Sequence, residues 1–181
     1  MVRRCGSLVV SSNEQRPRSM ARKVSKALDG QVRGKSIAVL GLTFKPNTDD
    51  MRDSPAISVI QSLQDMGAVI RAYDPAGMTQ ARTFLNAVTY SEDAYACAAG
   101  ADALVIITEW EQFRALDLDR LQQTMAQPII IDLRNVYRLS DMLKHGFRYL
   151  SVGRSPVEGA LAQVEGPSMA RASEVVARSV A

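Results

Sequence analysis

Short runs of apolar, mostly β-branched residues recur through the chain and are separated by stretches with a helical pattern. Because these runs are apolar at nearly every position, both faces of each strand must be covered, which is typical of a parallel sheet with helices on each side. The pattern therefore predicts an α/β fold with a doubly wound, mostly parallel, Rossmann-like sheet. The predicted strands lie at residues 36–41, 68–73, 87–90, 101–107, 128–132 and 147–150.

The first helix after a predicted strand has a clear start signal. Ser54 and Pro55 are typical of an N-cap and a first helical position, and Ile57, Ile60 and Leu63 then share one face. Further helices are expected over residues 94–99 and 116–125. Helices therefore alternate with strands, as a doubly wound fold requires.

The first 33 residues differ in charge from the rest. They hold eight basic and two acidic residues, a balance of +6, so the remainder carries −3 of the total of +3. Met20, Val24 and Leu28 recur at helical spacing, and Asp29–Gly30 predicts the helix end. We expect a linking helix whose apolar stripe packs on a partner. Nucleic-acid binding is not expected, because this arm has no aromatic residue for base stacking.

Composition limits the remaining classes. The chain has 181 residues, 46% hydrophobic and 23% charged, enough for one folded core with appendages. Cys5, Cys97 and the single histidine, His145, lack metal-ligand spacing, so no metal site is expected. No apolar run approaches the roughly 20 residues of a membrane span. We therefore expect a cytoplasmic protein with no membrane partner.

The loop after the first strand carries the strongest chemical signal. A dinucleotide-binding turn would need the spacing G-x-G-x-x-G, whereas this loop offers only Gly41. It carries Lys45 and Arg52 and leads into the helix start at Ser54, so it could hold a phosphate by side-chain charge and helix dipole together. The alternative is a solvated loop in which the nearby aspartates, residues 49, 50 and 53, pair with these cations.

The same loop resembles a known family. The string GLTFKPNTDDMRDSPA, preceded by GKSIAVL and followed by a helix and AYDP, is similar to the C-terminal UDP-binding domain of the UDP-glucose 6-dehydrogenase family. Thr108–Trp110 and Asp132–Asn135 resemble further motifs of this family, in the same order and at similar spacing. The resemblance covers roughly residues 13–153.

The resemblance implies a nucleotide-sugar site. Family members oxidise the C6 alcohol of a nucleotide-sugar to a carboxylate in two hydride transfers to NAD, through a cysteine thioester. By that likeness Phe44, Lys45 and Arg134 would contact the nucleotide-sugar, with Lys45 near its phosphates, and Arg52 would reach NAD bound mainly by another domain. The alternatives are that Phe44 is core, that Arg134 pairs with Asp132, and that the residues 109–110 serve packing.

The sequence offers no catalytic residue by the same comparison. The family's glycine fingerprint for NAD is absent, and the residues around Cys5 do not match the segment that holds the family's catalytic cysteine. We expect Cys97 to be a small buried hydrophobe and His145 a surface or capping residue. The residues 1–12 are expected to be a foreign or rearranged start.

Three parts are predicted along the chain. Residues 1–33 form an arm with a remnant of the linking helix, residues 34–153 form the UDP-sugar-binding domain, and residues 154–181 form a flexible tail without strands. A short helix after Pro167 is one option within that tail.

The resulting hypothesis is a C-terminal portion of an NAD-dependent UDP-glucose 6-dehydrogenase. It would bind UDP-glucose, catalyse nothing alone, and form a homodimer through the linking helix in the full-length enzyme. Two alternatives stay open. One is a related GDP-mannose or UDP-N-acetyl-hexosamine dehydrogenase, and the other is a stand-alone, non-catalytic binding or regulatory module.

Overall fold

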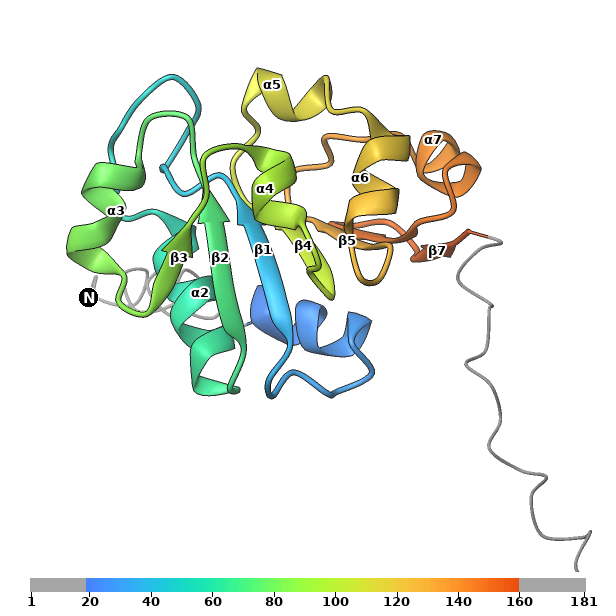
Figure 1. The fold of residues 1–181 in the computed structure, drawn as a ribbon, viewed down its shortest axis with the longest axis horizontal. Helices are drawn as coiled ribbons and strands as arrows, with labels where there is room; N and C mark the ends of the chain where they lie inside the picture. Colours follow the sequence, from blue (N-terminus) through green and yellow to red (C-terminus); the bar gives the residue numbers. More distant parts are fainter. Residues whose placement is uncertain (1–18, 160–181) are drawn as a thin grey trace, which may run out of the picture.

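The computed structural model describes residues 19–159, which contain one seven-stranded sheet (Figure 1). Its spatial order is β3-β2-β1-β4-β5-β6-β7; all neighbours are parallel except β6 and β7. This order reverses direction between β1 and β4, as in Rossmann-like sheets, and confirms the predicted doubly wound fold. The strands are β1 (Ser36–Leu40), β2 (Val69–Tyr73), β3 (Val88–Tyr90), β4 (Ala103–Ile106), β5 (Ile129–Asp132), β6 (Arg148–Ser151) and β7 (Val157–Glu158).

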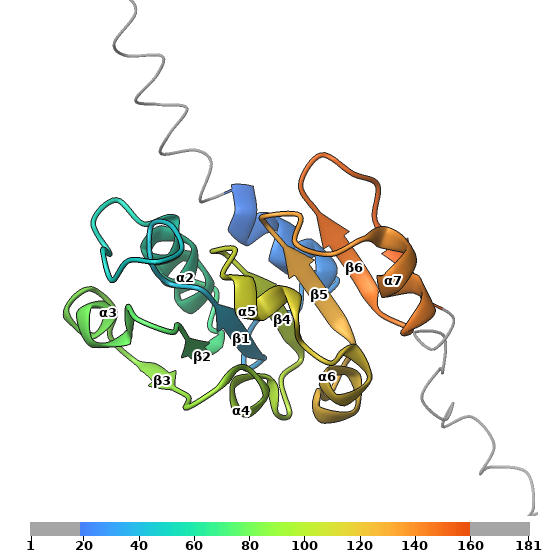
Figure 2. The same ribbon diagram turned by 90° about the horizontal axis from the view of Figure 1, so that it is seen from above.

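Successive side chains of each central strand enter two separate cores. In β1, Ile37 and Val39 belong to one apolar cluster, whereas Ala38 and Leu40 belong to the other. Both faces are covered by helices (Figure 2), so alternate apolar residues are all removed from water. The helices are α2 (Pro55–Asp65), α3 (Met78–Phe84), α4 (Ala94–Ala98), α5 (Glu111–Arg114), α6 (Leu118–Thr124) and α7 (Leu139–Lys144).

Local signals fix the start of α2 as the sequence predicts. Ser54 is the N-cap, its hydroxyl accepts from the N–H of Ala56, and Pro55 opens the first turn. Ile60 and Leu63 are buried on the face toward the sheet. The helix therefore begins at a defined place beside the loop that follows β1.

Residues 19–27 form a helix that packs on the sheet of this same domain. Val24 and Leu28 of the predicted stripe are buried in the first core cluster. Lys23 Nζ donates to the carbonyl of Ser151 at 2.6 Å, and Arg148 Nη1 donates to the carbonyl of Ala27 at 2.9 Å. The helix thus runs antiparallel to β6.

The partner of the apolar stripe is therefore the domain itself, which corrects the expected packing on another molecule. The opposite side of the helix exposes Arg22 and Lys26. Within residues 19–27 no apolar face is left for a second copy. The homodimer through the linking helix stays a prediction for a longer protein.

Other predictions differ in detail. The pattern did not predict α3 or α5, because they are short and bury few apolar side chains, Ala81 in α3 and Phe113 in α5. The expectation of no strand beyond residue 153 is wrong, since β7 pairs with β6. Two residues are too few to show a periodic pattern. The segment 1–12 and the optional helix after Pro167 lie outside the described residues.

Gly41 allows β1 and β4 to meet at the point where the sheet reverses direction. Its φ is +86°, and a Cβ there would lie 2.6 Å from both Cβ and N of Thr108. Two rigid backbone segments would have to separate to admit a methyl group. A glycine is therefore required by conformation and by space.

We predict that Gly41→Ala lowers the free energy of unfolding by about 3 kcal/mol or more, measured by urea denaturation. Gly100→Ala is the matched control, since φ there is +67° but nothing lies within 4 Å of the added Cβ. The control substitution should lower the free energy of unfolding by only about 1 kcal/mol. Equal losses in the two variants would contradict the steric argument.

Candidate functional site

The loops that follow β1, β2, β4 and β5 meet at the carboxyl edge of the sheet, at the upper end of Figure 1. In doubly wound folds this edge holds the ligand at the point where strand order reverses, which here lies between β1 and β4. The predicted residues Phe44, Lys45 and Arg52 lie on the loop after β1, and Arg134 lies on the loop after β5. The topology therefore brings both loops to one edge.

Asp74 joins three of these loops. Its carboxylate is fully buried, and Oδ2 accepts from the backbone N–H of Leu42 at 2.7 Å and from Trp110 Nε1 at 3.1 Å. Oδ1 accepts from the N–H of Gly77 at 2.7 Å. A buried carboxylate is tolerated when hydrogen bonds replace its water. Asp74 therefore connects the ends of β1, β2 and β4.

The loop after β1 is also held at both ends by hydroxyl groups. Thr108 Oγ1 donates to the carbonyl of Thr43 at 2.6 Å, and Ser54 Oγ donates to the carbonyl of Leu42 at 2.6 Å. All these hydroxyl groups are buried. The loop consequently leaves the sheet from a fixed position. Between its ends Met51 is buried in the core, whereas Phe44 and Lys45 are exposed.

Phe44 and Lys45 present their side chains to solvent. Phe44 is 52% exposed, so the alternative that it belongs to the core is wrong. Its N–H donates to the carbonyl of Asp50 at 2.9 Å, which closes the loop. Lys45 is exposed, and no described residue forms a hydrogen bond or ion pair with it. Its ammonium group is therefore available to an anion.

Arg52 has a carboxylate partner in the same loop. Its Nε and Nη2 donate to the two oxygens of Asp50, each at 3.0 Å, while the Arg52 side chain stays 81% exposed. These hydrogen bonds lower the pKa of Asp50 to about 2. The alternative of paired loop charges therefore holds for Arg52 and Asp50.

Asp132 fixes the backbone of the loop after β5. This buried carboxylate accepts from the N–H of Arg134 at 2.9 Å, from the N–H of Val136 at 2.6 Å and from the hydroxyl of Tyr149 at 2.7 Å. Asn135 adopts a φ of 58° and exchanges two hydrogen bonds of 3.2 Å with the backbone of Val152. The position of Arg134 is thereby set by its neighbours.

The Arg134 side chain pairs with Glu109, not with Asp132. Nε and Nη2 donate to the two carboxylate oxygens of Glu109, which follows β4. These bonds lower the pKa of Glu109. The alternative of an Arg134–Asp132 pair is therefore wrong for the side chain, because Asp132 is occupied by buried donors and bonds only the Arg134 backbone.

The sequence indicated a packing role as one option for Glu109 and Trp110, and it pointed to no more than a structural turn for Asp74. The structure shows a more specific arrangement, in which Asp74 joins the loops and receives the indole N–H of Trp110. The available signal is an acidic residue at the carboxyl end of a strand: Asp74 directly follows β2, and Asp132 is the last residue of β5. The Glu109–Arg134 pair has no such signal in the sequence.

The described cysteine and histidine do not form a reactive pair. Cys97 is fully buried, and burial raises the pKa of its thiol to about 11, so it is protonated near neutral pH. His145 Nδ1 lies 2.6 Å from Asp119 Oδ1 at the end of α7. Within residues 19–159 no group of three potential ligands could hold a metal, and no helix is long and apolar enough to span a membrane.

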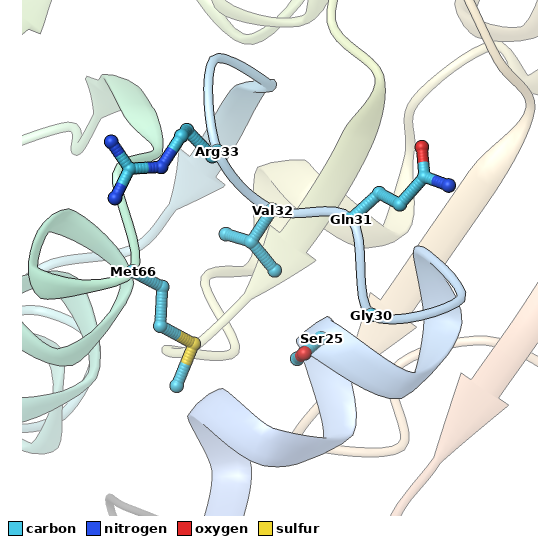
Figure 3. A pocket seen from close by; sticks show the side chains of 6 residues that line it. All are labelled: Ser25, Gly30, Gln31, Val32, Arg33 and Met66. Atoms are coloured by element: carbon cyan, nitrogen blue, oxygen red, sulfur yellow. The ribbon is translucent and has the colours of Figure 1, made fainter.

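Two hollows are found in the described part of the chain, one far from the site and one bordering the loop after β1. One of about 490 Å³ precedes β1 at the opposite edge of the sheet (Figure 3), and one of about 450 Å³ lies between the loop after β1 and α3. The first hollow is lined by one cationic side chain, Arg33, and by no carboxyl end of a strand, so it does not suit a diphosphate. It is lined by Ser25, Gly30, Gln31, Val32, Arg33 and Met66.

The fold and the loops define a Rossmann-like α/β domain of the dehydrogenase type. The model of the UDP-glucose/GDP-mannose dehydrogenase family, UDP binding domain, matches residues 38–139, and the chain belongs to this family. This confirms the resemblance predicted from the loop motifs.

Relatives and solved structures agree with this assignment. The chain is 60% identical over 145 residues to UDP-glucose 6-dehydrogenase of Rhizobium meliloti (strain 1021), covering 80% of this chain and 33% of that protein. The UDP-glucose dehydrogenase structure from Pyrobaculum islandicum is 36% identical, with a TM-score of 0.60 over 68% of this chain and 27% of that one.

A third comparison covers more of the fold. The NDP-N-acetyl-D-galactosaminuronic acid dehydrogenase of Methanosarcina mazei Go1 has a TM-score of 0.74 and 25% identity, over 89% of this chain and 33% of that one. The chain therefore spans about a third of the length of the curated relatives it matches.

We predict that Asp74→Asn lowers the free energy of unfolding by about 3 kcal/mol, because an amide nitrogen would face donors that the carboxylate now accepts. The emission of Trp110, the single tryptophan, should shift to longer wavelength as its indole loses its partner. Asp65→Asn, at an exposed position on α2, is the control. It should change neither the free energy of unfolding nor the emission of Trp110. An unchanged unfolding midpoint in Asp74→Asn would contradict the role of this carboxylate.

Proposed function

We propose that the carboxyl edge of the sheet binds the nucleotide part of a UDP-sugar, as the substrate-binding portion of an NAD-dependent UDP-glucose 6-dehydrogenase that oxidises UDP-glucose to UDP-glucuronate. The observation that carries the proposal is that Phe44, Lys45 and Arg134 are exposed on two loops whose backbone N–H groups donate to buried carboxylates. The family match and the names of the relatives support the ligand class.

Each of these side chains supplies a distinct interaction. Lys45 offers an exposed ammonium group that forms no ion pair with a described residue, although its charge acts on nearby Asp50, and this group suits a phosphate. Arg134 offers a planar guanidinium that can donate to a phosphate or a base carbonyl. The ring of Phe44 can cover the apolar face of a base or sugar. Together they suit a ligand that combines negative charge with a flat ring.

The described residues do not fit a complete NAD. The turn after β1 holds the single Gly41, whose Cβ position is filled by Thr108, and the first free N–H of α2 is capped by Ser54. A pyrophosphate turn needs glycines where the backbone approaches the ligand. We retain only the proposal that Arg52, exposed at the loop surface, contacts NAD bound elsewhere in the enzyme.

The chemistry of this domain is accordingly binding and orientation. Lys45 and Arg134 would hold the diphosphate end, and the rigid loop bases would keep that end fixed while the sugar extends from it. The fully buried thiol of Cys97 is not placed to attack a sugar carbon. We propose that hydride acceptor and nucleophile belong to another part of the enzyme.

We predict that UDP binds the 181-residue chain and binds more tightly than GDP, measured by isothermal titration calorimetry. Lys45→Ala and Arg134→Ala should each weaken UDP binding about tenfold, because a charge-assisted hydrogen bond to phosphate is lost. Lys144→Ala removes the same charge at the end of α7 and should leave binding unchanged. A preference for GDP would instead favour a GDP-sugar, and unchanged binding in both site variants would reject the proposed site.

We predict that the chain mixed with NAD and UDP-glucose forms no NADH, followed by absorbance at 340 nm. The described residues provide no exposed thiol for the covalent step. A full-length relative such as the Rhizobium meliloti enzyme is the positive control. Steady turnover by the chain alone would refute this division of roles.

A further inference from the structure

The ion pair between Glu109 and Arg134 is built from two residues whose backbones are held in place. Glu109 lies between Thr108, whose hydroxyl binds the loop after β1, and Trp110, whose indole binds Asp74. The backbone N–H of Arg134 binds the buried carboxylate of Asp132. Little backbone freedom remains, so the orientation of the Arg134 guanidinium depends on its side-chain torsions.

Glu109 is the residue that restricts those torsions. The two side chains are 41% and 27% exposed for Arg134 and Glu109, and the pair links the loops after β4 and β5. A surface ion pair contributes little to stability in general, because its side chains lose entropy and its charges are hydrated. A pair anchored this firmly at both ends therefore suggests a role other than stabilising the fold.

The geometry of the pair leaves a specific edge of the guanidinium available. Glu109 occupies the edge formed by Nε and Nη2, while no described residue accepts from Nη1 of Arg134. The second edge, between Nη1 and Nη2, keeps free hydrogens that can donate to two oxygens at once. Arg134 can thus bind Glu109 and an anion together.

We propose that Glu109 is a positioning residue that holds the Arg134 guanidinium with its Nη1–Nη2 edge directed to the nucleotide diphosphate. This proposal rests on the proposed function, since it concerns the same site. It assigns Glu109 an effect opposite to the one expected from charge alone: a carboxylate near a diphosphate would repel it, whereas a positioning carboxylate favours binding by preorganisation.

The test is calorimetric titration of UDP into the 181-residue chain and its variants. Glu109→Ala should weaken binding about five- to tenfold, because the freed arginine must be ordered by the ligand itself. Glu109→Gln, which can keep one hydrogen bond to Arg134, should recover most of the affinity. In the Arg134→Ala background, Glu109→Ala should cause no further loss.

Glu111→Ala is the matched control. Glu111 forms a 3.5 Å ion pair with Arg114 and is 92% exposed, so its removal changes the net charge equally without touching Arg134. UDP binding should then be unchanged. The emission of Trp110, next to Glu109 in sequence, and the urea midpoint should match the parent chain in all Glu109 variants, which shows that the site remains folded.

The outcomes separate the two proposals. If Arg134→Ala weakens UDP binding but Glu109→Ala and Glu109→Gln bind as well as the parent chain or more tightly, the positioning role is overturned and the proposed function stands. If neither Lys45→Ala nor Arg134→Ala weakens binding, the proposed function fails and the positioning role with it.

Discussion

The buried carboxylate of Asp74 is the interaction on which the carboxyl edge of the sheet depends. Removed from water, it needs hydrogen bonds from every side, and its donors come from the loops after β1, β2 and β4. A single side chain therefore makes three chain segments mutually dependent. On the other side of β4, the buried carboxylate of Asp132 holds the loop after β5 in the same way, through hydrogen bonds that it accepts. Exposed side chains can then be held in defined positions although they lie on loops.

This construction explains how a body of net negative charge can suit an anionic ligand. Residues 34–181 carry −3 in total, yet Lys45 is exposed and forms no ion pair with a described residue, and the Arg134 side chain is paired with Glu109. Arg52 is likewise paired, with its neighbour Asp50. Attraction to a diphosphate would therefore come from a few placed groups and not from a basic surface, so selectivity depends on loop geometry.

The parts of the fold predicted from sequence are those whose signal is local. Largely apolar runs predicted β1 to β6, most clearly β4 and β5, in which every residue is buried. Ser54–Pro55 predicted the start of α2, because capping depends on adjacent residues. The loop motif predicted where Phe44, Lys45 and Arg52 lie. β7 and α5 were not predicted, because elements of two and four residues are too short to show a periodic pattern of apolar residues.

The pairing of Arg134 could not be predicted, because it depends on the distance between two loops. Asp132 is two residues from Arg134 in the sequence, whereas Glu109 is 25 positions away. Only the parallel pairing of β4 with β5 brings the two loops together. Asp132 is meanwhile committed to the buried donors that shape its own loop. The contact to which we assign a role in ligand orientation thus arises from topology, and its two residues can be paired only after the sheet order is known.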